Sequence, residues 1–158
     1  MESAVYPLFA DLLEYPTPAL GNEVEACIEL LKPLQPETAL KLAQFQSAFQ
    51  QHNLAWMEEL YTSTFDMQPV CYPYVGFHLF GESYKRGAFM AKLVEGYRQH
   101  GFATGNDLPD HLPVILRFMA LEGAAPDEDF RHALLFEGLI PALEKMIRSL
   151  EGQPNPYG

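Results

Sequence analysis

The chain has little positive charge and lacks the features of secreted, membrane-spanning or nucleic-acid-binding proteins. Ten Lys and Arg residues stand against 21 Asp and Glu residues, for a formal net charge of -11, and such a surface repels phosphate backbones. Cys27 and Cys71 lie outside any CxxC or Cys/His spacing, which indicates reduced thiols and a cytosolic protein. The first basic residue, Lys32, comes too late for a secretory signal. No apolar run reaches the ~20 residues of a membrane helix. We therefore expect a cytoplasmic protein that binds no nucleic acid and does not insert into membranes.

Motifs of common catalytic sites are also missing. The sequence contains no GxxxxGK[ST] phosphate loop, no GxSxG elbow and no paired Glu-x-x-His segments of a di-iron bundle. The residues therefore favour a binding protein without cofactor or metal over an enzyme.

Prolines fall where helical patterns begin and glycines where they end, while strand-like alternation is scarce. This punctuation predicts an all-α protein, a single-domain bundle of about eight or nine helices over residues 1–150, followed by a flexible tail over 151–158. The expected features are a helix over 5–14, helices starting at Thr17, Pro36 and Asn53, a short aromatic helix after the loop that begins at Asp66, a long helix from Ser83 to about His100, a buried helix over 114–121, and a last pair started by Asp127 and started or kinked by Pro141.

The stretch NDLPDHLPVIL, residues 106–116, combines two carboxylates, a histidine and two prolines. A helix capped by Asp107 would place Pro113 where its ring clashes with the carbonyl four residues earlier. A turn over residues 108–111 instead makes Asp110 the N-cap and puts Pro113 in the tolerated first turn. His111 then lies near the positive end of the helix dipole and is expected to be neutral near pH 7.

Three uses of this turn remain open from the residues alone. Asp110 and His111 could serve only the local structure, or Arg86 could pair with a carboxylate of the turn. Asp107, Asp110 and His111 could also bind a metal, although no further acidic or His cluster is spaced to complete the shell.

Large aromatic residues gather between Tyr61 and Phe80. They are too numerous for one loop to bury, so some are expected to line a groove, although core packing is favoured for Phe65 and Phe77. A groove with aromatic walls and acidic rims suits a peptide that is apolar in one part and basic in another.

Three segments together resemble a known family: YTSTFD (61–66), YPYVGFHLFGESYKRGAFMAKLVEGYRQHGF (72–102) and NDLPDHLPVILRFMA (106–120). The sequence is similar to the NarJ-like branch of the TorD/NarJ family, the nitrate reductase delta subunits and assembly chaperones. Members are cytoplasmic all-helical chaperones for molybdoenzyme maturation.

The resemblance implies that the protein binds the N-terminal segment of a molybdopterin-containing catalytic subunit, such as a twin-arginine signal peptide or its remnant, and acts with the cofactor insertion machinery. The residues that we expect to contact this client are Asp107, Asp110, His111, Pro109, Tyr61, Phe65, Tyr72, Tyr74, His78, Glu82 and Arg86. Where the family usually has a glutamate before the Leu-Pro, this chain has Asp107, a shorter carboxylate.

Two other readings stay open at this point. One is a small metal- or nucleotide-dependent enzyme that uses Asp107, Asp110 and His111, and the other is a structural subunit of the mature reductase. Both a monomer and a segment-swapped dimer are compatible with the proline-broken stretch 68–73.

Overall fold

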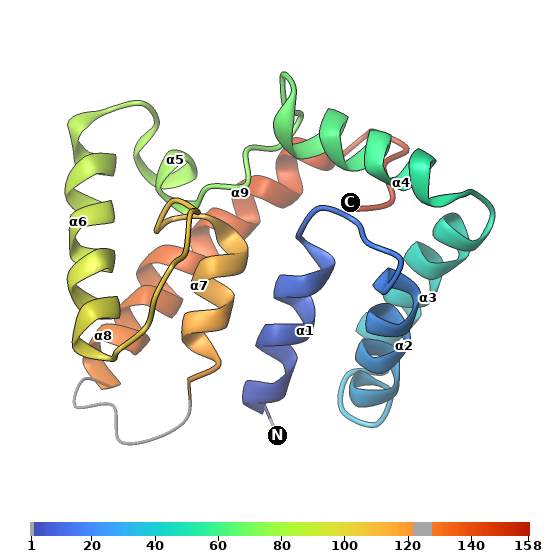
Figure 1. The fold of residues 1–158 in the computed structure, drawn as a ribbon, viewed down its shortest axis with the longest axis horizontal. Coiled ribbons are helices and arrows are strands. Elements are labelled where there is room, and N and C mark those ends of the chain that lie inside the picture. The colour runs from blue at the N-terminus through green and yellow to red at the C-terminus, as the bar shows by residue number, and fades with distance from the viewer. Residues whose placement is uncertain (1, 122–127) are drawn as a thin grey trace.

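A computed structural model describes residues 2–121 and 128–158, which are helical through most of their length (Figure 1). The elements, in chain order, are η1 (Glu2–Ala4), α1 (Val5–Leu12), α2 (Leu20–Leu31), α3 (Pro36–Gln50), α4 (Leu54–Tyr61), the π-helical turn η2 (Thr62–Asp66), α5 (Val75–Phe80), α6 (Tyr84–Gln99), α7 (Leu112–Met119), α8 (Glu128–Ala133), the π-helical segment η3 (Leu134–Leu139) and α9 (Ile140–Leu150). The predicted all-α class is confirmed. None of the described helices combines the length and the apolar character that crossing a bilayer requires.

Helix starts agree with their local chemistry in most places. Pro36 is in the first turn of α3, where its missing N–H is harmless. Asn53 is the N-cap of α4, and its Oδ1 accepts a hydrogen bond from the Trp56 N–H at 2.9 Å. The second helix differs from expectation, because Thr17 forms a separate turn and α2 begins at Leu20. The cap predicted at Asp127 lies outside the described residues.

Two clusters of buried apolar side chains form the core. One joins α2, α3 and α4 to the end of α1, and the other joins α5, α6, α7, η3 and α9. Helix α1 packs against both α2 and α7, so it lies between the two clusters, as Figure 1 shows. As predicted, α7 is buried on nearly every side, and Arg117 is its single residue that is not buried.

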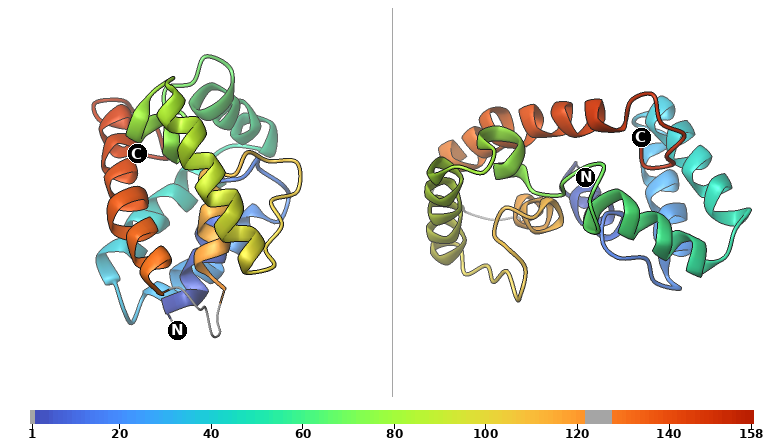
Figure 2. Two further views of the ribbon diagram at one scale, coloured as in Figure 1. Left: turned by 90° about the vertical axis from the view of Figure 1, so that its left-hand side faces the viewer. Right: turned by 90° about the horizontal axis from the view of Figure 1, so that it is seen from above.

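The last helical elements form one long run. Figure 2 shows α8, η3 and α9 following one another along one side of the molecule. Pro141 falls in the first turn of α9, directly after the wide turn η3. A proline in a continuous helix removes one backbone donor and clashes with the carbonyl four residues earlier, and a π-helical turn absorbs this misfit.

The C-terminal segment 151–158 was expected to be a flexible tail, but the structure packs it onto the bundle. The Tyr157 ring lies 4.9 Å from the Phe65 ring and 5.1 Å from the Phe45 ring, between centroids. Asn155 Nδ2 donates a hydrogen bond to Thr64 Oγ1 at 2.9 Å. Tyr157 also packs against both hydrophobic clusters, so the segment helps to join them.

Candidate functional site

The turn before α7 has the predicted shape but a different cap. The His111 N–H donates to the Leu108 carbonyl at 3.1 Å, which closes the turn, and Pro113 lies in the first turn of α7. The prediction that Asp110 caps the helix is wrong. His111 occupies the N-cap position without a side-chain cap bond, because the Asp110 carboxylate points toward another helix.

Asp110 forms a buried ion pair with Arg86 of α6. Arg86 Nε donates to Oδ2 at 2.9 Å and Nη2 donates to Oδ1 at 3.3 Å, so the guanidinium holds both carboxylate oxygens. The Asp110 side chain is 0% exposed and the Arg86 side chain 20% exposed. Its hydrogen bonds to Asp110 raise the pKa of Arg86, and the guanidinium carbon lies 5.2 Å from the centre of the Tyr74 ring. The pairing of Arg86 with this turn is confirmed.

Gly76 explains how α5 comes so close to this pair. A Cβ atom at position 76 would stand 2.7 Å from Asp110 Oδ2 and 3.1 Å from Arg86 Cγ. Only glycine therefore fits between the helix start and the ion pair.

Backbone and side-chain bonds fix the turn on both sides. The Val75 N–H donates to the Asp110 carbonyl and the Leu112 N–H to the Pro73 carbonyl, both at 2.9 Å, around an isolated antiparallel bridge between Tyr74 and His111. The buried Tyr97 hydroxyl donates to the Pro109 carbonyl at 2.7 Å. Segments 73–75 and 109–112 are thus held rigidly together.

The remaining predicted site residues divide between core and surface. Tyr61 and Phe65 are buried, with 8% and 6% exposure, whereas Tyr72 is 39% exposed and Tyr74 half-buried. His78 Nε2 lies 2.6 Å from the Tyr72 carbonyl oxygen and stabilises the loop. Glu82 is exposed at the start of α6. An apolar cavity of about 360 Å³ is lined by other residues, among them Phe9, Leu12, Leu42, Phe45, Ile147 and Tyr157.

Carboxylates from distant parts of the chain gather beside the turn. Glu14, just past the end of α1, joins Asp107 and His111, and one ligand atom of each lies within 4.8 Å of the others. Glu14, Asp66 and Asp107 all raise the pKa of Tyr61 by their negative charge, after the larger effect of burial. Asp66 and Asp107 also raise the pKa of Tyr74, on which burial again has the largest effect. We call Glu14, Asp66, Asp107 and His111 the acidic corner.

His111 differs from the carboxylates of the acidic corner in being 7% exposed. Burial lowers its pKa, more strongly than the nearby carboxylates raise it, so the ring is neutral near pH 7. The expected neutral form is confirmed, with burial rather than the helix dipole as the main cause. Its Nδ1 atom has no hydrogen-bond partner in the part of the chain that the structure describes.

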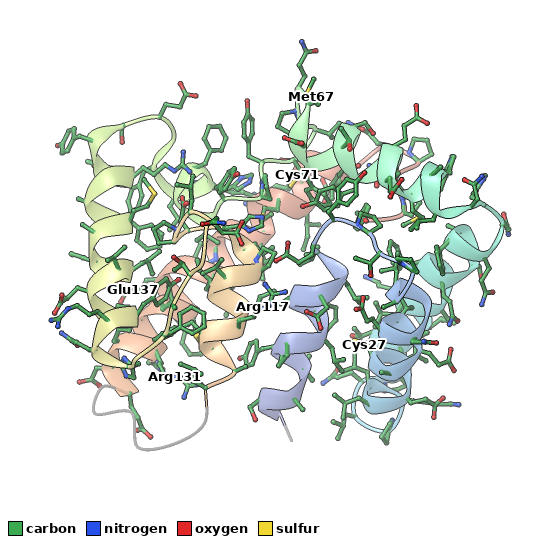
Figure 3. All side chains as sticks on the ribbon, viewed as in Figure 1. Cys27, Met67, Cys71, Arg117, Arg131 and Glu137 are labelled. Atoms are coloured by element: carbon green, nitrogen blue, oxygen red, sulfur yellow. The ribbon has the colours of Figure 1, made fainter. Side chains whose placement is uncertain are left out.

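Arg117 ties the acidic corner to the body of the protein. Its guanidinium donates to Glu14 Oε1 at 2.7 Å and to Asp11 Oδ1 at 3.0 Å. Figure 3 shows Arg117 between α7 and α1. Sequence reasoning missed Glu14, because nothing in its neighbourhood sets it apart from other carboxylates near helix ends.

Sequence comparisons identify the family of the chain. A family profile described as nitrate reductase delta subunit matches residues 31–149. The nitrate reductase molybdenum cofactor assembly chaperone NarJ of Escherichia coli strain K12 is 33% identical over 162 residues, which cover 87% of this chain and 69% of that protein. A Bacillus subtilis strain 168 protein, provisionally named as the same kind of chaperone, is 29% identical over 148 residues, which cover 92% of this chain and 78% of that protein.

A solved structure shares the fold. It is a crystal structure from Archaeoglobus fulgidus, provisionally described as a redox enzyme maturation protein, with a TM-score of 0.65, 20% sequence identity and coverage of 99% of this chain and 86% of that one.

The family and the relatives together define an assembly chaperone rather than an enzyme. More particularly, the chain belongs to the nitrate reductase delta subunit family. The reading as a metal- or nucleotide-dependent enzyme is therefore set aside.

Proposed function

We propose that the protein is a cytoplasmic chaperone that binds the N-terminal segment of a molybdopterin-containing catalytic subunit of the nitrate reductase type while that subunit receives its cofactor. Membership of the family supports the chaperone role. The observation that supports the binding site is the acidic corner, where the exposed carboxylates of Asp66 and Asp107 raise the pKa of Tyr61 and Tyr74 by their negative charge.

The corner suits a client segment that is basic in one part and apolar in another. Asp66 and Asp107 are exposed and make no ion pair with any described residue, so a client Lys or Arg side chain can reach them. Three exposed apolar side chains lie near these residues. Met67 and Leu108 directly follow Asp66 and Asp107 in the chain, and the Tyr15 ring meets the Tyr61 ring edge-on, with 5.5 Å between centroids.

In this proposal Asp110 positions the turn, although the sequence led us to expect that it contacts the client. Its carboxylate is neutralised by Arg86 and closed off from solvent, so it holds the turn in place while Asp107 presents the charge. The charge that the client meets is therefore carried by Asp66 and Asp107, with Glu14 partly engaged by Arg117.

The test uses a fluorescently labelled synthetic peptide with the N-terminal sequence of a nitrate reductase catalytic subunit. Its binding is measured by fluorescence anisotropy with a chelator present. Asp107→Asn and Asp66→Asn should each weaken binding by about 1 kcal/mol, roughly fivefold in Kd, as expected for one exposed ion pair. Glu59→Gln, which removes an exposed carboxylate of α4, is the matched control and should leave the Kd unchanged. A peptide that binds both Asp variants as tightly as the unmodified protein would place the client elsewhere.

A further inference from the structure

The buried imidazole of His111 and two carboxylates of the acidic corner converge from two segments that are far apart in the chain. Glu14 follows α1, whereas Asp107 and His111 belong to the turn before α7, and one ligand atom of each lies within 4.8 Å of the others. This convergence depends on the packing of α1 against α7 and on the rigid turn.

His111 supplies a second observation, independent of the carboxylates. The side chain is 7% exposed, and Nδ1 is buried without a hydrogen-bond partner among residues 2–121 and 128–158. A buried polar atom left in this state costs roughly 1–3 kcal/mol and usually signals a water molecule or an ion. An imidazole nitrogen is also a common ligand of divalent transition metals.

The charges around the cluster favour a cation. Asp11 and Glu14 share one guanidinium, that of Arg117, and Asp107 lies beside Glu14, so these three carboxylates carry two more negative charges than Arg117 balances. Arg117 opposes a cation by its own charge, but it also holds Glu14 Oε1 and thereby orients the carboxylate. Asp110 adds no net charge because Arg86 pairs with it.

We propose that Glu14, Asp107 and His111 bind one divalent first-row transition cation of the Zn²⁺ type, with water in the remaining positions. One imidazole nitrogen and two carboxylate oxygens are ligands that Zn²⁺ and its neighbours accept, whereas Ca²⁺ and Mg²⁺ prefer oxygen alone. Ligand atoms about 2.0–2.1 Å from a tetrahedral ion stand roughly 3.4 Å apart. The cluster must therefore contract slightly, and the exposed Asp107 side chain can move to do so.

The test uses the full chain, freed of metal by a chelator and exchanged into clean buffer, with no client peptide present. Titration with ZnCl₂ in a calorimeter should give one bound ion per chain, and CaCl₂ should give none. CoCl₂ should produce the visible absorption bands of a Co²⁺ ion bound to nitrogen and oxygen.

His111→Gln and Asp107→Asn should each weaken Zn²⁺ binding by at least about tenfold. Asp107 is exposed, so its variant keeps the test valid if the His111 variant folds poorly. The matched controls are His52→Gln and Glu59→Gln, which remove an exposed imidazole and an exposed carboxylate of the α4 region, and they should bind Zn²⁺ like the unmodified protein.

Lack of stoichiometric Zn²⁺ or Co²⁺ binding, or binding that both cluster variants retain, would overturn the site. Neither result bears on the client-binding proposal, because the client assay contains a chelator and reads a peptide.

Discussion

The buried ion pair between Arg86 and Asp110 predicts an unusually large effect for one arginine substitution. Arg86→Met leaves the Asp110 carboxylate, which is 0% exposed, without its two hydrogen bonds. Removing one partner of a buried ion pair costs about 3–5 kcal/mol. Because Arg86 is 20% exposed, we expect the loss of unfolding free energy to lie at the lower end of this range, about 3 kcal/mol. For a chain of this size, that lowers Tm by roughly 6–12 °C. Urea unfolding followed by circular dichroism measures the change.

The same helix supplies a matched control. Arg98 pairs with Glu95 at 2.8 Å, but the two side chains are 72% and 52% exposed, so Arg98→Met should leave the urea midpoint nearly unchanged. Asp110→Asn leaves a guanidinium that still reaches solvent, so it should cost less than Arg86→Met, about 2 kcal/mol. The double substitution should cost less than the sum of the two single ones. An Arg86→Met protein as stable as Arg98→Met would refute the reasoning.

Three further predictions concern the same region. Gly76→Ala should destabilise the fold by about 1–3 kcal/mol in urea unfolding, because its Cβ would lie 2.7 Å from Asp110 Oδ2; unchanged stability would mean that the pair can shift. Tyr97→Phe should lower stability by about 1–2 kcal/mol by leaving the Pro109 carbonyl without its donor, and an unchanged urea midpoint would contradict this. Burial lowers the pKa of His78 below its ordinary value of 6.5, so below that pH the unfolded chain binds more protons than the folded protein. The contribution of a neutral His78 to the stability of the fold is therefore complete above about pH 6.5 and is lost as the pH falls through the folded pKa. Urea midpoints measured with a chelator present should therefore fall less steeply between about pH 7.5 and pH 5 in His78→Gln than in the unmodified protein. Equal slopes for the two proteins would argue against this role of His78.

Much of the fold could be predicted because the information is local. Pro36 and Asn53 specify helix starts through backbone geometry and a short-range hydrogen bond, and the structure has both where expected. The apolar residues of α7 predicted a buried helix because no face of it is polar. The position of Pro113 alone excluded a helix capped by Asp107.

The candidate site was predicted less well, because its contacts are long-range. Whether Asp110 caps its own helix or pairs with Arg86 depends on where α6 lies, and residue spacing does not specify that. Glu14 stands 93 residues before Asp107, so only the packing of α1 against α7 brings them together. The packing of segment 151–158 likewise depends on Tyr157 reaching Phe45 and Phe65, whereas the Gly- and Pro-rich composition of the segment suggested a flexible tail.

The placement of α1 between the two hydrophobic clusters has a consequence for protein synthesis. Helices α2, α3 and α4 follow one another closely and can pack together while the ribosome is still at work, but α1 contacts α7, and Arg117 reaches back to Asp11 across 106 residues. The acidic corner therefore does not exist on a nascent chain until α7 has emerged. Under the proposed function, the client segment therefore cannot be bound at the acidic corner before α7 has packed against α1, so the folding of the chaperone sets the earliest moment of binding.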